Sequence, residues 1–348
     1  MDKMINNFNK RHIPSFMIVN NSIIYCDNKT SIVSDYNDYI VSLLKQFIEN
    51  TNASININFV VFGNECTDFG NNNPTIRIEC NYEHTLVLPD GRDTCDAVQG
   101  KLYDSEGKRM DYLARLVNHT ELAKSDIVID YSFPNVAHIG MSGEFRNIYN
   151  KMTWIYPSLY EENELCKSTD RRVIDCLTTF YDTNQPRRKK IADELILLAK
   201  KNCNDFHSNY TYINKNNCFD KNKLQDLYFH TKILVNIHQT DHHHTLEELR
   251  ILPALQCGVL VICEKTTINE NKLLNVEYDD YIIWATYDEI VQKTIEVIEN
   301  YEKYFHDIFL QPKKVNLYDF DAQNYRQLEM RLSKFTNAHG MHQTILEI

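Results

Sequence analysis

The 348-residue sequence has few glycines, and none of them belongs to a phosphate-binding loop. The chain contains nine glycines, with neither a G-x-G-x-x-G fingerprint nor a G-x-x-x-x-G-K-S/T loop. This absence disfavours a dinucleotide oxidoreductase and a P-loop kinase. Long apolar runs are missing as well, because no stretch approaches the roughly twenty apolar residues of a transmembrane helix.

Paired cysteines and an excess of positive charge are also missing. The ten cysteines stand singly, without a C-x-x-C pair, which favours reduced thiols in a cytoplasmic protein. The N-terminal residues are polar and lack the apolar core of a secretory signal. The net charge is −11, whereas a nucleic-acid-binding surface needs a basic stripe. We therefore expect a cytoplasmic protein without a nucleic-acid partner.

The chain does contain an alternation of short apolar runs and helical spacings. Residues 57–62 and 126–130 are typical of buried strands, and residues 35–49 and 110–124 have helical spacing. Residues 76–78 and 85–88 are expected to form a strand pair. The pattern predicts an α/β fold with an N-terminal Rossmann-like domain over residues 1–165 and a second over 166–320. A helix and tail over 321–348 would then be free to pack back on the first domain.

A strand–helix–strand unit in the second half is the clearest local signal. Residues 233–237 form an apolar β-branched run, and residues 259–262 form another. Between them, the capping box Thr245-Leu-Glu-Glu248 predicts a helix that ends near Gly258. Such a unit places its loop and helix start at the carboxyl edge of a parallel sheet, where open α/β sheets bind ligands. A helix N-terminus favours anions at that edge.

A basic cluster, Arg187-Arg188-Lys189, opens another helix directly after the strand predicted over residues 173–181. Cations are poorly placed at a helix N-terminus for stability alone, whereas arginine suits bidentate phosphate contacts. We interpret Arg187 and Arg188 as phosphate-binding residues. The alternative is a solvated basic turn that pairs with nearby acids.

Three more candidates belong to the strand–helix–strand unit. Glu247 and Arg250 are three residues apart and share a helix face. They form either an intrahelical ion pair worth roughly a few tenths of a kcal/mol or a ligand site in which Glu247 accepts from hydroxyls and Arg250 holds a phosphate. His238 lies at the carboxyl end of a strand, where it either contacts the ligand or is a buried histidine satisfied by the backbone.

Metal chemistry is disfavoured, and the first half offers candidates of another kind. Three adjacent histidines, residues 242–244, cannot all aim at one metal, and no cysteine or carboxylate stands at usual ligand spacing. In the first half, His84 or Glu83 is a candidate general base on a hydroxyl. The segment Asp130-Tyr-Ser-Phe-Pro-Asn135 ends another strand in the same manner. A turn is the alternative at both places.

Residues 252–262, L-P-A-L-Q-C-G-V-L-V-I, resemble the helix–glycine–strand segment E-A-x-A-x-G-x-P-V-I of the GT-B glycosyltransferases. Residues 173–189 resemble the start of that family's donor domain, whose cations hold the nucleotide diphosphate. Pro253 stands where the common family has a glutamate that grips the donor ribose. With Glu247 and Arg250 placed earlier and Glu264 closing the next strand, the chain looks more like a bacterial and large-virus branch, related to the group 1 and CgeB-like transferases.

The resemblance implies two Rossmann-like domains that face each other across a cleft. It also implies a metal-independent, hexosyltransferase-like enzyme without a cofactor. A nucleotide-diphosphate sugar would be the donor, and a glycan, lipid or protein hydroxyl the acceptor. The implied donor-binding residues are Arg187, Arg188, His238, Glu247, Arg250 and Glu264. Two alternatives stay open: a sugar-nucleotide epimerase of related fold, and a non-catalytic nucleotide-sugar-binding or scaffold protein.

Overall fold

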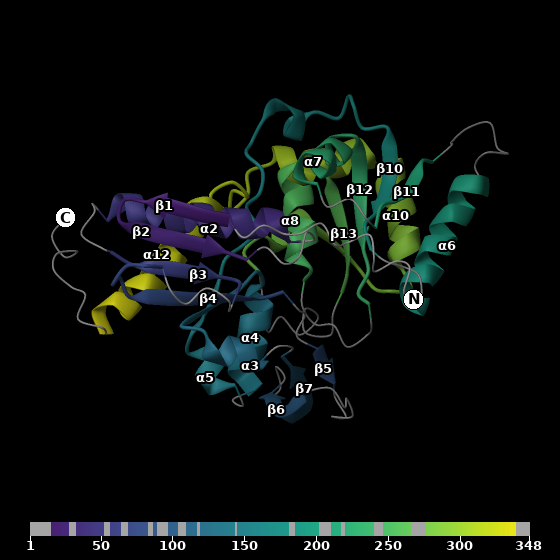
Figure 1. Ribbon diagram of the computed structural model, residues 1–348. Coiled ribbons are helices and arrows are strands. Elements are labelled where there is room, and N and C mark those ends of the chain that lie inside the picture. The colour runs from purple at the N-terminus through teal and green to yellow at the C-terminus, as the bar shows by residue number, and fades with distance from the viewer. Residues whose placement is uncertain are drawn as a thin grey trace, which may run out of the picture.

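Two mainly parallel sheets organise the chain, one in each half (Figure 1). The computed structural model describes residues 15–27, 33–51, 56–63, 69–82, 86–88, 97–103, 109–116, 119–142, 145–180, 185–201, 210–216, 220–239, 246–265 and 276–338. Helices connect several of the successive strands in both halves. The predicted α/β class with two Rossmann-like sheets is confirmed.

The first sheet has the strand order β1-β2-β3-β4-β8-β9. Its β1–β2 pair is antiparallel and its other pairs are parallel. Strands β3 and β8 are buried along their whole length, as expected of parallel strands covered on both faces. The strands and helices of this half are β1 Ser15–Val19, β2 Ser22–Cys26, α2 Ser34–Asn50, β3 Asn58–Val61, β4 Thr75–Asn81, α3 His119–Lys124, β8 Ile127–Asp130, α4 Phe133–Ser142, α5 Arg146–Tyr149 and β9 Met152–Trp154.

The second sheet is entirely parallel, with the order β11-β10-β12-β13-β14. The first two strands in sequence lie on one side of β12 and the last two on the other. The order therefore reverses between β10 and β12, a topological switch point of the kind at which open α/β sheets bind ligands. The elements are η1 Glu164–Lys167, β10 Ile174–Thr178, α6 Pro186–Lys201, β11 Tyr212–Asn214, α7 Lys221–Phe229, β12 Thr231–Asn236, α8 Glu248–Gln256, β13 Leu260–Glu264, η2 Asp279–Tyr281, β14 Ile282–Ala285, α10 Ile290–Glu299, α11 Tyr301–Phe305 and η3 His306–Leu310.

The last helix, α12 (Phe320–Ala338), returns to the first sheet, where Figure 1 shows it in yellow. Leu328 and Leu332 belong to the hydrophobic core of that half. Asn324 accepts a hydrogen bond from the Tyr156 N–H at 2.8 Å and donates to the Tyr156 carbonyl at 2.7 Å. The C-terminal helix thus covers the N-terminal half of the chain.

Two local predictions in the first half are wrong. The helix predicted over residues 110–124 is instead strand β7 (Arg109–Arg115) followed by α3. Strand β7 pairs on both sides, with β5 (Leu86–Leu88) and β6 (Ala97–Tyr103), in a small antiparallel sheet. The predicted strand pair of residues 76–78 and 85–88 does not form either, because β4 pairs with β3 and β8. Pairing with other strands decides both outcomes, and the spacing of apolar residues within one segment does not report that pairing.

Candidate functional site

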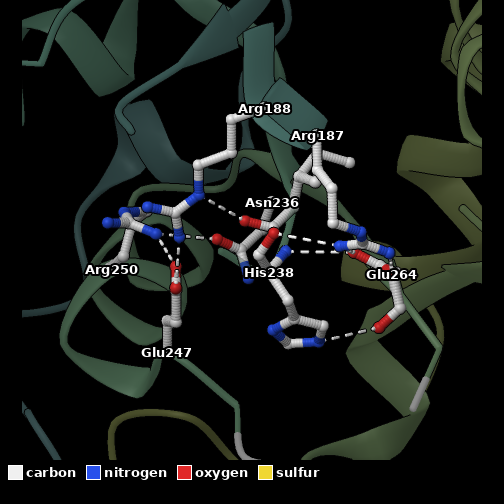
Figure 2. Close-up of polar contacts among 8 residues, drawn as sticks. Arg187, Arg188, Asn236, His238, Glu247, Arg250 and Glu264 are labelled. Atoms are coloured by element: carbon white, nitrogen blue, oxygen red, sulfur yellow. Dashed lines mark hydrogen bonds and ion pairs between the residues drawn. The ribbon is translucent and has the colours of Figure 1, made fainter. Parts of the chain in front are cut away.

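The predicted basic cluster lies at the switch point of the second sheet. Arg187 and Arg188 occupy the first turn of α6, which follows β10. Asn236 ends β12, His238 follows it, and Glu264 ends the next strand, β13. Because these strands run parallel, the carboxyl ends that carry the residues meet at one edge of the sheet. Figure 2 shows the resulting group of polar contacts.

Arg187 forms a bidentate ion pair with Glu264. Its Nη2 lies 2.5 Å from Oε1 and its Nη1 lies 3.2 Å from Oε2, and Nη1 also donates to the His238 carbonyl at 3.1 Å. The guanidinium stacks on the ring of Tyr287 at 4.1 Å, and the Tyr287 hydroxyl donates to the Arg187 carbonyl at 2.9 Å. The Arg187 side chain remains 24% exposed, so an incoming anion has access to it.

Arg188 is buried and serves the interior of the cluster. Its Nη2 donates to Glu247 Oε1 at 2.6 Å and its Nε to the Ile237 carbonyl at 3.0 Å. The side chain is 8% exposed, and burial lowers the pKa of its guanidinium to about 10, at which it still carries its charge at neutral pH. These contacts make Arg188 a structural cation that fixes Glu247, in contrast to the accessible Arg187.

Arg250 completes the cluster and lies beside Arg188 on the Glu247 carboxylate (Figure 2). It forms an ion pair with the Glu247 carboxylate, and its Nη1 donates to Asn236 Oδ1 at 3.0 Å. Burial, and then the nearby charge of Arg188, lowers the pKa of Arg250 to about 10. Its side chain keeps 24% exposure. The ion pair expected between Glu247 and Arg250 therefore forms, and Arg188 is a second arginine on the same carboxylate.

The cluster carries one positive charge in excess. Three guanidinium groups face the two carboxylates of Glu247 and Glu264. Fixed cations beside a helix N-terminus, in a partly buried setting, favour an anion over water. Arginine presents a planar fork of donors, which matches the oxygens of a phosphate. The arrangement is therefore suited to bind an anion at the two exposed arginines.

His238 is held by the backbone and by Glu264. It is 1% exposed, its N–H donates to Glu264 Oε2 at 3.0 Å, and its Nε2 lies 3.2 Å from the Glu264 carbonyl oxygen. His238 is therefore buried, and Glu264 holds both its backbone N–H and its Nε2. Its carbonyl accepts from Arg187 and its backbone N–H donates to the Glu264 carboxylate, so the backbone of His238 fixes the geometry of the Arg187–Glu264 pair.

Glu248 does not close a capping box at the start of α8, so this prediction is wrong. The helix begins at Glu248, and within the described residues its N-cap, Glu247, makes no side-chain cap bond. The Glu248 carboxylate instead accepts a hydrogen bond from the Ser132 hydroxyl at 2.8 Å, from the segment that follows β8 in the first sheet. Both residues are fully buried. A contact between the two halves thus takes the place of the expected local cap.

The first-half candidates have different outcomes. Glu83 and His84 lie outside the described residues, as do Thr245 and residues 242–244. Asp130 is fully buried at the end of β8 and accepts from Asn81 at 2.7 Å, Asn135 at 3.1 Å and the Ser132 N–H at 2.9 Å. Burial raises its pKa to about 7, against these hydrogen bonds.

The described part of the chain contains neither a metal-binding group nor a membrane-spanning helix. No group of three or more His, Cys, Asp or Glu side chains there is arranged to hold a metal ion. In the same residues, no helix combines the length and the apolar character needed to cross a membrane.

Sequence reasoning missed three residues that shape the site. Asn236 could have been found, because a polar residue at the end of an apolar strand is a signal of function at a carboxyl edge. Tyr287 and Ser132 gave no comparable signal. They reach the cluster and its helix from segments 100 and 116 residues away in sequence.

No protein-family model matches this chain. An uncharacterized protein, R358, of Acanthamoeba polyphaga mimivirus is 33% identical over 78 residues, which cover 22% of this chain and 28% of that protein. Among solved structures, the pneumococcal O-GlcNAc transferase GtfA, in complex with UDP and GlcNAc, gives a TM-score of 0.44 at 12% identity and covers 88% of this chain. This chain spans 61% of that GtfA chain.

Two further solved structures are similar at the same level. Anabaena HepE in complex with UDP and glucose gives a TM-score of 0.40 at 9% identity, over 86% of this chain and 76% of that one. Sucrose-phosphate synthase from Thermosynechococcus elongatus gives 0.39 at 10% identity, over 88% and 79%. At these low identities and scores, the likenesses do not decide the activity of this chain.

Proposed function

We propose that this protein is a glycosyltransferase that moves a sugar from a nucleotide-diphosphate sugar to an acceptor hydroxyl. The observation that carries the proposal is the arginine cluster with one excess positive charge at the switch point between β10 and β12. Open α/β sheets bind nucleotides at such points, and a diphosphate is the anion that suits two exposed arginines. The motifs shared with GT-B glycosyltransferases lie in the same segments.

The residues of the cluster take different roles in this proposal. Arg187 and Arg250, each 24% exposed, hold the diphosphate, while the buried Arg188 fixes Glu247 between them. Glu264, which pairs with Arg187, shares that arginine with the phosphate and accepts from a sugar hydroxyl. Protein cations and the start of α6 offset the charge of the leaving diphosphate, so the transfer proceeds without a metal ion.

The two halves divide the substrates between them. Residues 166–320 form the donor domain, because the arginine cluster belongs to the second sheet. Residues 1–165 form the acceptor domain, with residues 321–348 as its C-terminal cover. A glycan, lipid or protein supplies the acceptor hydroxyl. Glu83 and His84 remain the proposed general bases for that hydroxyl.

Calorimetric titration with nucleoside diphosphates tests the anion site. Charge-assisted hydrogen bonds contribute about 1.5–3 kcal/mol, so Arg187→Ala and Arg250→Ala should each weaken binding about tenfold to a hundredfold. Lys189→Ala is the matched control, because Lys189 lies in the same turn as Arg187 and pairs with Asp193 at the surface, 60% exposed. If wild-type protein does not bind, or Arg187→Ala behaves as Lys189→Ala does, the proposal is wrong. An unchanged affinity in excess EDTA is expected for metal-independent binding.

Product analysis then separates transfer from the two alternatives. Wild-type protein is incubated with a nucleotide sugar that binds, with and without a panel of acceptors. A rearranged sugar formed without any acceptor would identify an epimerase, and binding without turnover on any acceptor would identify a binding protein. A glycosylated acceptor together with free nucleoside diphosphate is the expected result.

A further inference from the structure

The start of α8 joins the two halves of the molecule, and Figure 1 shows this helix between the two sheets. Glu248 accepts the hydrogen bond from Ser132 at 2.8 Å, and Leu249 packs against the hydrophobic core of the first half. The residues on either side, Glu247 and Arg250, belong to the arginine cluster. One helical turn therefore faces the first half with two residues and the anion site with two others.

The Ser132–Glu248 bond is built into the interior of the protein. Both side chains are 0% exposed, and the Ser132 N–H is fixed in turn by Asp130 at 2.9 Å. Burial, and after it the nearby charge of Asp130, raises the pKa of Glu248 well above its ordinary value, against the hydrogen bond from Ser132. A carboxyl group that is neutral in this place still accepts from the hydroxyl and avoids repulsion by Asp130.

We propose that Ser132 and Glu248 are positioning residues for the anion site: the first half holds the first turn of α8 through this bond and thereby sets where Arg250 points. Neither side chain touches the ligand. The proposal rests in part on the proposed function, because it assigns to the acceptor domain a direct influence on donor binding. A donor site aligned in this way is complete only when the two halves are in contact.

Ser132→Ala tests the proposal with a small change, and Ser125→Ala is its control. Ser125 is also a buried serine of the first half, but its hydroxyl donates to the Leu122 carbonyl at 2.7 Å within that half. Loss of one buried hydrogen bond corresponds to about a fivefold to tenfold effect. We expect Ser132→Ala to speed amide hydrogen exchange in α8 by that factor and to weaken nucleoside diphosphate binding equally. Ser125→Ala should do neither, and exchange in β10 and β12 should stay unchanged in both variants.

Glu248→Gln and Glu248→Ala add a second comparison. Glutamine resembles a neutral carboxyl group and keeps an oxygen for Ser132, so Glu248→Gln should retain the exchange protection of α8 that Glu248→Ala loses. The proposal would be overturned if amide exchange in α8 were equal in Ser132→Ala and Ser125→Ala. It would also be overturned if Glu248→Gln and Glu248→Ala lost the same exchange protection. The exchange measurement needs no ligand. A wild-type protein that binds no nucleoside diphosphate would therefore refute the proposed function while the exchange data still decide this inference.

Discussion

Removing the Glu247 carboxylate should strongly destabilise the second half of the molecule. Glu247→Ala leaves Arg188, whose side chain is 8% exposed, without the acid that lies 2.6 Å from its Nη2. Breaking a buried ion pair from one side costs about 3–5 kcal/mol, because the remaining charge is desolvated without compensation. Arg250 loses the same partner, which favours the upper part of that range. Domains are stable by only about 5–15 kcal/mol, so the loss is a large fraction of the total.

Urea unfolding followed by tryptophan fluorescence measures this loss of stability in the half of the molecule that contains Glu247. The chain has two tryptophans, Trp154 in β9 and Trp284 in β14. A Trp154→Phe background therefore makes Trp284 the reporter of the second sheet. The reference is Lys189→Ala, which breaks a surface pair with Asp193 and should cost less than about 0.5 kcal/mol.

The double variant Arg188→Met/Glu247→Leu separates charge from packing. Replacing both partners of a buried pair by apolar residues of similar volume is often neutral or stabilising. The double variant should therefore recover the part of the lost stability that comes from Arg188, whereas the part that comes from Arg250, which also pairs with Glu247, stays lost. A cost for Glu247→Ala below about 1 kcal/mol would refute the view that Arg188 is a buried structural cation. A double variant that is less stable than Glu247→Ala would refute the same view.

Three further predictions concern stability. Asp130 has a folded-state pKa of about 7 against an ordinary 3.8, so the folded state holds the extra proton between these values. Stability should fall by up to about 4 kcal/mol as pH rises from about 4 to 7, and urea titrations of Asp130→Asn should show a weaker pH dependence. Gly258→Ala should cost more than Gly70→Ala in thermal unfolding. Both glycines have a positive φ, but of the two only Gly258 has backbone atoms where a Cβ would stand, with the Cys166 carbonyl oxygen 2.1 Å from it. Equal losses of stability in the two variants would contradict this prediction. Asn324→Ala leaves the buried Tyr156 N–H without its acceptor, at about 1–3 kcal/mol, while the Tyr156 carbonyl keeps the Ser158 N–H. Helix α12 should then become sensitive to proteolysis, and unchanged resistance would speak against this prediction.

The sequence by itself determined most of the second half. The apolar β-branched runs before His238 and Glu264 form β12 and β13, because a strand buried on both faces favours an unbroken apolar run. The strand predicted before Arg187 forms β10, although it contains Asp175. The order of strands and helices makes the sheet parallel, and this brings the polar residues that follow the strands to one edge. These local signals therefore bring six residues into one group of polar contacts: Arg187, Arg188, His238, Glu247, Arg250 and Glu264.

The tertiary structure decided which groups pair within that network and across the two halves. Arg187 pairs with an acid 77 residues away in sequence, and Glu248 bonds to a serine 116 residues away. The local spacing Thr245-Leu-Glu-Glu248 predicts that Glu248 caps the start of its own helix. The helix start is buried against the first half, however, and a buried carboxyl group takes the donor that packing brings to it. Periodicity reports which face of a segment is buried, while the partner on the other side of that face is fixed only when the sheets and helices come together.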